Sequence, residues 1–397
     1  MTIIIWGIGN MSCLIEEYIK HDVIIAAYVD NNAKNAGGRY VNAHERKTRI
    51  VSADEVKDIA FDFCVIAVKD SQTIVQQCLK DLKIPKEKIL EIVKLTEWDI
   101  DLRNRIFNER IVDNSRNYVI EGVCIDLGEG HALPSYQKYF KMYDRFIPYL
   151  AKMTQEKTGK YIIDIGANVG DTLAAMLNHT DDNFLCIEPV GQFFNLLASN
   201  IQHFDNPNRI WLEQAFITDK MSETYEAIIS DKGTAAKMPT DSNTTSRIPS
   251  KSVDYLLEER NITYEEVDLL KIDTDGFDAD CIISASKLLE KGSAFIYWEN
   301  YNETYDQYIK YLNAYRLLNE NGYSVFFVFD NYGNYLCKGG IDVLNSILDY
   351  VQRAHTGCIG NTFKYFDVLT CKMNDVEKCE RYITQYLDQY LLHRISW

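Results

Sequence analysis

Two short segments of the sequence share one pattern, an apolar strand that runs directly into a glycine-containing turn and then into a helix. They are IIIWGIGNMS at residues 3–12 and YIIDIGANVGDT at residues 161–172. Glycine permits positive φ and a close approach of the backbone to a ligand, and the first N–H groups of a helix favour anionic groups. The repeated pattern predicts two α/β units, each with a ligand-binding type of turn at the carboxyl edge of its sheet.

The chain length supports the same division. A chain of 397 residues is longer than one hydrophobic core usually serves, so we expect at least two domains. Apolar runs alternate with helical patterns up to about residue 95 and again from Tyr161. We therefore expect a small Rossmann-like domain at 1–95, a connector with a helix at 96–160, and a larger α/β domain at 161–397.

Seven strands are expected in the larger domain, interleaved with helices as a doubly wound sheet, with an antiparallel edge near its end. The pattern predicts them at Tyr161–Ile165, Phe184–Ile187, Ile210–Phe216, Val267–Ile272, Ala294–Trp298, Tyr323–Phe329 and Tyr365–Cys371.

Charge and composition exclude some classes of function. The net charge of −16 argues against nucleic acid as the main partner, because phosphate binding needs a basic surface. The ten cysteines form no C-x-x-C pair, which disfavours a zinc site. No run of about 18 apolar residues is present, and the first residues do not resemble a signal peptide, so we expect a cytoplasmic protein without a membrane span.

The second turn indicates a particular ligand. Its spacing, G-A-N-V-G, differs from the G-x-G-x-x-G of dinucleotide sites, and Asp164 lies two residues before the first glycine. An acid there suits a ligand that carries an ammonium or sulfonium group. Glu188 ends the next strand, and a carboxylate at that point accepts hydrogen bonds from both ribose hydroxyls. A ligand with ribose, amine, carboxylate and positive sulfur is S-adenosylmethionine.

Four segments, IDIGANVGDT, CIEPVGQFFNLLASNI, LLKIDTDGFDADCI and YFDVLT, together resemble the FkbM-type S-adenosylmethionine-dependent methyltransferases over about residues 161–371. The resemblance implies a class I methyltransferase fold and O-methylation, commonly of sugar or polyketide hydroxyls. By matching position it implies that the methionine part contacts the second turn, at Asp164, Gly166, Asn168 and Gly170, that the ribose contacts Glu188, and that the adenine contacts the end of the third strand. The implied cofactor-binding residues are Asp164, Gly166, Asn168, Gly170, Asp171, Thr172, Glu188, Pro189, Ala215 and Phe216.

The sequence departs from the family pattern at one point that concerns catalysis. The family usually has K-I-D-x-E-G-x-E, whereas this chain has KIDTDGFD, with Asp275 and Asp278 in place of glutamates. A shorter side chain keeps the charge and moves it by about one methylene, which changes the reach of a base at either position.

Methyl transfer to a hydroxyl needs an aligned acceptor oxygen and a base or a metal to assist it. We expect Asp273, Asp275 and Glu299, which follow the fourth and fifth strands, to be catalytic. Asp273, Asp275 and Asp278 would also suit Mg²⁺. The alternative, which we favour, has no metal: Asp273 contacts the cofactor and Asp278 caps the next helix. His131 is a second candidate base or an exposed loop residue.

Two polar segments between the third and fourth strands, 229–238 and 241–250, are rich in small residues. They are typical of an active-site loop or of a plain surface loop, and the sequence leaves both open.

The first turn has an incomplete dinucleotide fingerprint. Its expected nucleotide-binding residues are Gly7, Gly9, Asn10 and Asp30, and Ser12 replaces the third glycine. The segment resembles the small Rossmann-like N-terminal domains of sugar acyltransferases, in which the pocket can hold a nucleotide-sugar. Three interpretations stay open: binding of a nucleotide-linked sugar, a structural or dimerising module, or binding of NAD.

The leading hypothesis is an S-adenosylmethionine-dependent O-methyltransferase that acts on a sugar hydroxyl, nucleotide-linked or in a glycan precursor, in carbohydrate or polysaccharide biosynthesis. A homodimer is one expected form of the protein. The first alternative is a nucleotide-sugar oxidoreductase that uses NAD in the N-terminal domain, although no Y-x-x-x-K motif beside a serine is seen. The second is a non-catalytic binding protein of glycan assembly.

Overall fold

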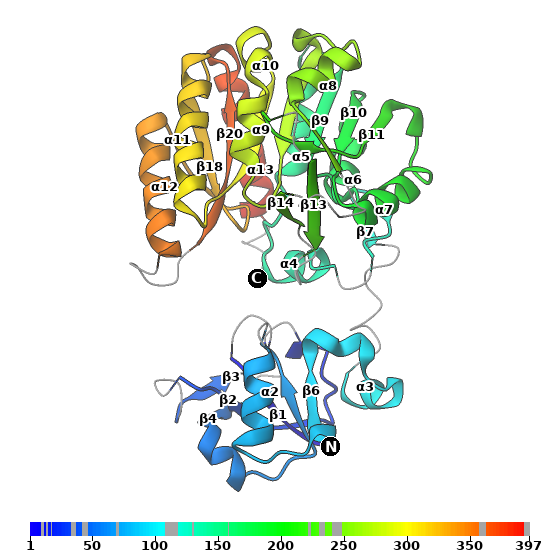
Figure 1. Ribbon diagram of the computed structural model, residues 1–397, viewed down its shortest axis with the longest axis vertical. Helices are drawn as coiled ribbons and strands as arrows, with labels where there is room; N and C mark the ends of the chain where they lie inside the picture. Colours follow the sequence, from blue (N-terminus) through cyan, green and yellow to red (C-terminus); the bar gives the residue numbers. More distant parts are fainter. Residues whose placement is uncertain are drawn as a thin grey trace. The chain divides into compact units, whose positions relative to one another are not determined.

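The computed structural model describes residues 1–8, 12, 15–16, 18–32, 37–41, 47–68, 71–107, 118–128, 131–157, 159–220, 224–229, 235–239, 248–356 and 363–392. The chain divides into two compact units, Met1–Asn114 and Ser115–Trp397, which are described one at a time (Figure 1). The expected connector at 96–160 is divided between them: its first helix, α3, belongs to the first unit, and its later helices belong to the second.

The described strands of the first unit form a six-stranded sheet in the order β3-β4-β2-β1-β5-β6. All neighbours are parallel except β3 and β4. The strands are β1 (Thr2–Trp6), β2 (Ile24–Val29), β3 (Arg39–Val41), β4 (Lys47–Val51), β5 (Phe63–Ile66) and β6 (Ile89–Glu91). Two helices have described bounds, α2 (Ser71–Lys80) and α3 (Ile100–Ile106), and 3-10 turns lie at Ala53–Asp58, Lys86–Lys88 and Ile92–Glu97. Apolar clusters cover both faces of this sheet.

The described strands of the second unit form an eight-stranded sheet in the order β11-β10-β9-β16-β17-β20-β18-β19. The strands are β9 (Tyr161–Ile165), β10 (Asn183–Ile187), β11 (Ile210–Glu213), β16 (Val267–Ile272), β17 (Phe295–Tyr301), β18 (Val325–Asp330), β19 (Tyr335–Gly339) and β20 (Tyr365–Cys371). The first five strands in this order, β11, β10, β9, β16 and β17, are parallel to one another, and β20 is antiparallel to both β17 and β18. The doubly wound α/β fold and the antiparallel edge are confirmed.

Two details of the sheet differ from the prediction. A hairpin adds β19 as an eighth strand at the edge beside β18, where the sequence analysis expected seven strands. The predicted strand Ile210–Phe216 is divided: β11 stays in the large sheet, and β12 (Phe216–Ile217) pairs with β15 (Ile248–Lys251) instead.

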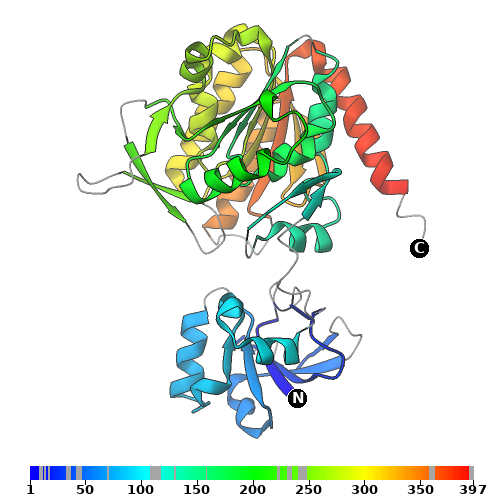
Figure 2. The same ribbon diagram turned by 90° about the vertical axis from the view of Figure 1, so that its right-hand side faces the viewer.

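A small sheet joins β12 and β15 to β13 (Thr224–Ile229) and β14 (Ala235–Pro239). Figure 2 shows β13 and β14 projecting from the unit on the side away from α13 (Val376–Leu392). Most of the described part of 229–238 is therefore strand and not loop, while 241–247 lies outside the described residues. A two-stranded ribbon, β7 (Tyr118–Ile120) and β8 (Val123–Ile125), completes the strands.

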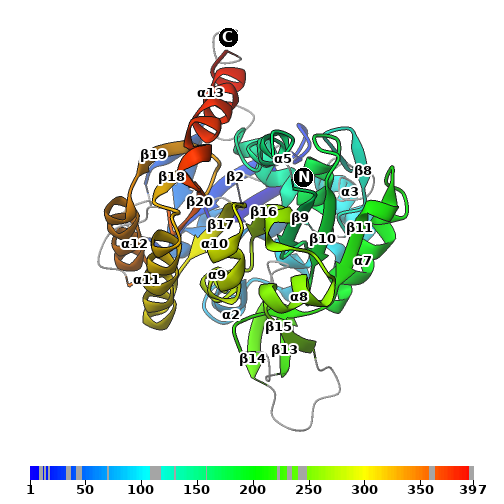
Figure 3. The same cartoon turned by 90° about the horizontal axis from the view of Figure 1, so that it is seen from above.

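Helices cover both faces of the large sheet (Figure 3). One face carries α5 (Ile147–Thr154), α6 (Asp171–Leu177), α7 (Gly191–Ile201) and α13. The other carries α8 (Val253–Glu259), α9 (Asp278–Ser284), α10 (Ser286–Lys291), α11 (Tyr305–Glu320) and α12 (Ile341–His355). The remaining helix is α4 (Leu133–Tyr139), and 3-10 turns lie at Pro207–Arg209, Tyr264–Glu266 and Met373–Asp375.

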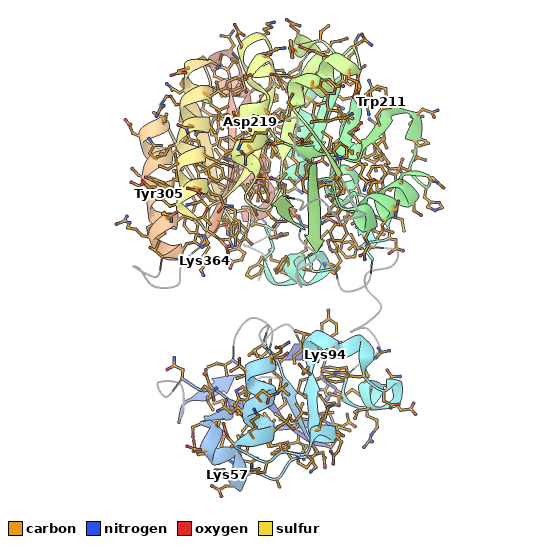
Figure 4. All side chains as sticks on the ribbon, viewed as in Figure 1. Lys57, Lys94, Trp211, Asp219, Tyr305 and Lys364 are labelled. Atoms are coloured by element: carbon orange, nitrogen blue, oxygen red, sulfur yellow. The ribbon has the colours of Figure 1, made fainter. Side chains whose placement is uncertain are left out.

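Because the central strands are buried on both faces, their sequences are almost continuously apolar. Figure 4 shows side chains filling the space between strands and helices; Trp211 on β11 stacks on Tyr161 with ring centroids 5.4 Å apart, whereas Tyr305 at the start of α11 is 67% exposed. A charged residue within such strands therefore needs a specific partner. Among the described helices, none is both long enough and apolar enough to cross a membrane.

Candidate functional site

The turn after β9 passes so close to the end of β16 that only glycine fits at position 166. Gly166 has φ +77°, and a Cβ there would lie 1.7 Å from the carbonyl oxygen of Asp273. The Gly166 N–H donates to the carbonyl oxygen of Ile187 at 2.9 Å, which ties the turn to the end of β10. Gly170, at φ +91°, begins α6 against Leu197. The backbone of this turn is thus fixed at the carboxyl edge of three neighbouring strands.

Glu188, directly after β10, is a buried acid whose two oxygens are both held by the backbone. Its Oε2 accepts from the N–H of Asn168 at 2.9 Å, and its Oε1 accepts from the N–H of Val190 at 2.8 Å. The side chain is 4% exposed, and burial raises its pKa to about 7. Each carboxylate oxygen keeps a lone pair for a further donor, as two ribose hydroxyls require.

Asn168 supplies a second acceptor in the same turn. It has φ +48°, and its Oδ1 is buried with no hydrogen-bond partner among the described residues. A buried acceptor without a donor costs about 1–3 kcal/mol, so a ligand that donates to it is favoured. The donors of a nucleoside and an amino group fit the acceptors of this turn.

Asp164 lies under the turn and has no exposed surface. Its Oδ1 is 3.1 Å from the Nζ of Lys271, and its Oδ2 accepts from the hydroxyl of Thr172 at 2.9 Å. Lys271 is 1% exposed and its Nζ also lies 3.5 Å from the Oδ2 of Asp273. Asp164 therefore positions Lys271, and through it Asp273, in this structure.

The pKa values of this pair follow from burial and charge. Burial raises the pKa of Asp164, and the charge of Lys271 offsets part of that shift. Burial lowers the pKa of Lys271, but the carboxylates of Asp164, Asp273 and Asp171 raise it by more, so its net shift is upward. Lys271 is therefore a permanent cation beneath the site.

A small pocket opens beside this pair, on the face of the sheet that α5 and α6 cover. Thr172, Asp273 and Glu299, three of the expected site residues, line it. Its full lining is Tyr143, Asp144, Ile147, Thr172, Lys271, Ile272, Asp273, Tyr297, Glu299, Asn331, Gly333, Tyr365 and Asp367. Four carboxyls, three tyrosines, one amide and one cation therefore face a common space.

Two of these carboxyls come from neighbouring strands at the same level. Glu299 on β17 is paired in register with Asp367 on β20. Burial raises the pKa of both, and the negative charge of Asp273 raises both further. Tyr297, two residues before Glu299 and so on the same face of β17, hydrogen-bonds to the Asp367 carboxyl.

The acids of the KIDTDGFD turn do not all reach the pocket. Asp275, at φ +52°, is exposed in the turn and is not part of the pocket lining. Asp278 is fully buried at the start of α9, where its Oδ2 accepts from the Thr274 hydroxyl at 2.9 Å and from the Gly276 N–H at 3.3 Å. Burial raises its pKa to about 8. Across the described residues, no group of three or more His, Cys, Asp or Glu has the arrangement of a metal site.

Of the residues expected at the adenine, Ala215 lies in the loop after β11 and Phe216 begins β12. Ala215 and Phe216 are buried, and the neighbouring Gln214 donates from its Nε2 to the carbonyl oxygen of Pro189 at 3.2 Å. This bond joins the loop after β11 to the loop that carries Glu188. Asp171, the first residue of α6, lines an adjoining pocket together with Asp144 and Thr172.

The first unit offers less of a site in its described residues. Gly7 has φ +109°, and a Cβ there would lie 2.8 Å from Val68 and 2.9 Å from the carbonyl oxygen of Ala67. Packing between β1 and β5 thus accounts for this glycine without a ligand. Asp30 follows β2, and its carboxylate accepts from the Asn32 N–H at 2.8 Å. Gly9 and Asn10 lie outside the described residues.

The candidate base His131 lies just before α4. Its Nδ1 accepts from the Leu133 N–H at 3.2 Å, and it is not part of the pocket lining. Its position favours the interpretation as a loop residue over that as a base.

Sequence reasoning missed several pocket residues, namely Tyr143, Asp144, Lys271, Tyr297, Asn331, Tyr365 and Asp367. Lys271 and Asp367 had a signal, because each is a charged residue inside an otherwise apolar strand. Tyr143 and Asp144 had none: they are held by tertiary contacts around Met142, whose carbonyl oxygen would lie 2.1 Å from a Cβ at Gly333.

Residues 164–325 match the model of the methyltransferase FkbM domain, and residues 1–90 match the model described as C2185-like, N-terminal. A search of curated proteins found no match.

Solved structures similar to this chain include methyltransferases at low identity. An O-methyltransferase from Bacillus cereus in complex with S-adenosylhomocysteine is 13% identical, with 58% of this chain and 80% of that chain covered and a TM-score of 0.32. A precorrin-6y C5,15-methyltransferase from Geobacter metallireducens GS-15 is 12% identical, with 57% and 87% covered and a TM-score of 0.30.

The match to the family model covers the turn after β9, Glu188, the KIDTDGFD turn and Glu299, which are the features that define the site. The second unit therefore contains a domain of the FkbM methyltransferase family, and the protein is an S-adenosylmethionine-dependent methyltransferase.

Proposed function

We propose that the protein transfers a methyl group to a hydroxyl of a sugar, either nucleotide-linked or part of a glycan precursor. The observation that carries this proposal is the composition of the pocket beside the cofactor turn, which combines Asp144, Asp273, Glu299 and Asp367 with three tyrosines. Carboxylates accept hydrogen bonds from several hydroxyls at once, and tyrosine rings offer flat apolar surfaces to the C–H face of a sugar ring. A purely apolar acceptor would leave these acids without partners.

We further infer where the cofactor is held. Glu188 receives the ribose hydroxyls, since both of its oxygens are fixed by N–H groups and keep free lone pairs. The turn from Gly166 to Gly170 lies along the methionine part, and the loop with Ala215 and Phe216 lies along the adenine. Asp273, 47% exposed in its side chain and beside Lys271, faces the amino group.

The cofactor supplies a methyl group on positive sulfur, already activated for transfer. The protein's own residues orient the acceptor and receive its proton. Asn331 and Tyr365 border the pocket on the side of β18 and β20, while Tyr143 and Asp144 border it from the segment before α5. They hold the acceptor so that one hydroxyl faces Glu299, whose pKa is raised by burial and by the charge of Asp273, which makes it a stronger proton acceptor than a free carboxylate.

The first unit is proposed to recognise a nucleotide carrier or to act as a structural module. Its match to an N-terminal family model supports its treatment as a separate unit, and its parallel strands β1, β2 and β5 bring Gly7 and Asp30 near one sheet edge. The domain limits and the roles of Gly9 and Asn10 are part of this proposal.

The function is tested by incubating the full chain with S-adenosylmethionine and a panel of sugars, nucleotide-sugars and short glycans. We expect a mass increase of one methyl group on a sugar member of the panel. Matched acceptors that carry a catechol, a carboxylate or an amine in place of sugar hydroxyls serve as controls. Methylation confined to those controls would contradict the sugar assignment while leaving the methyltransferase assignment intact.

A further inference from the structure

Asp367 is a pocket carboxyl that lies in the YFDVLT segment, and the sequence predicted no role for it in the reaction. It lies near the start of β20, directly opposite Glu299 of β17 in the antiparallel register. Directly opposite residues of antiparallel strands have Cβ atoms about 4.5–5.5 Å apart and point to the same face. Both side chains line the pocket, so the two carboxyls share one space.

The groups around this pair are mostly acidic. Those that share the pocket lining with it are Asp273 and Lys271, Asp144 from the segment before α5, and Tyr297, Tyr365 and Tyr143. The groups outside the lining whose electrostatic interaction with the pair shifts a pKa are Asp275, Asp278, Tyr301 and Tyr311. Lys271 is the one cationic side chain in the lining, and it is already paired with Asp164. Two partly buried carboxyls in register, with further acids in the same pocket, do not both ionise readily, since like charges and burial each favour the protonated form.

An independent observation indicates that a hydrogen-bond donor enters this pocket. Asn331 is 8% exposed and lines the pocket, and its Oδ1 has no hydrogen-bond partner among the described residues. Its side chain also hydrogen-bonds to Tyr365, which must use the amide nitrogen. The unpaired Oδ1 of Asn331 therefore suits an acceptor hydroxyl brought against the pair.

We propose that Glu299 and Asp367 form a carboxyl pair that holds between one and two protons in the free site and one proton once S-adenosylmethionine is bound, and that takes up the proton of the acceptor hydroxyl during methyl transfer. The inference rests on the proposed methylation of a hydroxyl and assigns its base. The acceptor O–H bond breaks and its proton joins the pair, which becomes neutral. The oxygen forms the new C–O bond, and the electron pair of the broken C–S bond stays on sulfur, which also becomes neutral. The proton leaves to solvent after product release.

The charges of this step balance within the site. A pair with one proton carries one negative charge, which matches the one positive charge of the sulfonium, and both disappear together. Arranged in this way, the step needs no second cation.

The first test needs no acceptor. Isothermal titration calorimetry in buffers of different ionisation enthalpy counts the protons released when S-adenosylmethionine or S-adenosylhomocysteine binds to the full chain at pH 7.5. The positive sulfur of the former lies beside the pair and favours its ionisation, whereas the latter has neutral sulfur. We expect the wild type to release about half a proton more with S-adenosylmethionine.

Asp367→Asn and Glu299→Gln should each remove most of this difference, while both ligands still bind. The matched control is Asp268→Asn, a buried acid at the opposite end of β16 whose pKa burial raises to about 7 and whose Oδ1 accepts from the Gly159 N–H at 3.1 Å. The control should keep the difference. Equal proton release with both ligands in the wild type, or a difference that survives both substitutions, overturns the proposal.

The second test uses the acceptor found by the mass-shift panel. We expect the wild-type kcat to rise with pH as the pair passes from two bound protons to one, which is the active form. Asp367→Asn should lower kcat by about 100-fold or more. Removing one acid also lowers the pKa of the other, so the rising limb should move to lower pH. If Asp367 had only a structural role, Asp367→Asn would lower kcat by the same factor at every pH, and the rising limb of the pH profile would not move. The first test uses no acceptor. Failure of the sugar assignment therefore leaves the first test of the carboxyl pair valid.

Discussion

At the scale of single residues, the site depends on a few positions where sterics leave no choice. Gly166 combines positive φ with a backbone so close to β16 that a Cβ would lie 1.7 Å from the Asp273 carbonyl oxygen. This close approach brings the cofactor turn and the Asp273 turn together. Glu188 depends on the same turn, because the Asn168 N–H fixes one of its oxygens.

Gly166→Ala should destabilise the methyltransferase unit by about 3 kcal/mol or more, through backbone strain and the forced movement of Asp273. Gly322→Ala is the matched control: Gly322 also has positive φ, +84°, but the nearest contact of its Cβ would be a flexible lysine atom at 3.6 Å. That change should cost about 1 kcal/mol. Urea unfolding of both variants measures the difference, and equal losses would show that the close approach is not restrictive.

Glu188→Ala should weaken binding of S-adenosylhomocysteine by about 100-fold, because two hydrogen bonds from the ribose to a carboxylate are lost. Calorimetric titration measures the loss. Glu258→Ala removes an exposed acid of α8 that is paired with Lys287 of α10, and it should leave the affinity unchanged. An unchanged affinity in Glu188→Ala would remove the ribose assignment.

At the scale of elements, the site forms where the carboxyl ends of β9, β10, β16 and β17 meet the start of β20 and the β18–β19 turn. Register explains the grouping: Lys271 is paired with Asp164 on one side and with Tyr297 on the other, and Glu299 is paired with Asp367. These side chains lie on the face covered by α5 and α6, so helix packing buries them and shifts their pKa values.

The same arrangement explains what the sequence could predict. Asp164, Glu188, Asp273 and Glu299 follow parallel strands, and parallel strand ends converge at one edge whatever the strand order. Asp367 enters from the beginning of an antiparallel strand, so its place depends on β20 lying between β17 and β18, which spacing does not reveal.

Asp144 depends on tertiary packing alone. The Tyr386 hydroxyl of α13 donates to the Gly333 carbonyl oxygen at 2.6 Å, and Gly333 packs on the segment before α5 that carries Asp144. Such contacts between distant segments leave no local pattern in the sequence.

Lys271→Met should destabilise the unit by about 3–5 kcal/mol, because it leaves the fully buried Asp164 without its cation. The double variant Lys271→Met, Asp164→Asn removes both charges and should recover at least half of the loss. Urea unfolding at pH 7 measures both. If the double variant is no more stable than the single one, the pair does not act as a unit.

At the scale of the whole molecule, the chain contains two α/β units with similar turns that differ in what surrounds them. The turn at Gly166 adjoins a pocket lined by four acids, whereas the described residues near Gly7 show a glycine explained by packing against Val68 and Ala67. The sequence predicted the strand-to-helix turn at Gly166 and the sheet of the second unit, whereas most of the turn after Gly7 lies outside the described residues. The sequence did not predict β19 or the division of the 210–216 strand, because edge pairing is decided by tertiary contacts.

The buried acids should make stability depend on pH. The pKa of Asp278 is about 8 in the folded chain against 3.8 for a free carboxyl. The folded state therefore holds a proton that the unfolded state has lost, and this contribution to stability is complete below about pH 4 and disappears as the pH rises through about 8. Relative to Asp278→Asn, the unliganded wild type should lose about 1 kcal/mol of stability per pH unit between pH 5 and 7. Urea unfolding across this range measures the loss. If the difference in stability between the wild type and Asp278→Asn did not change with pH, Asp278 would not be protonated in the folded chain.

The most direct measurement for the whole account is a crystal structure of the full chain with S-adenosylhomocysteine. We expect both ribose hydroxyls within hydrogen-bond distance of Glu188 and the sulfur facing the pocket that Glu299 and Asp367 line. A nucleoside bound at the Gly7 turn instead, or a sulfur directed away from that pocket, would contradict the account.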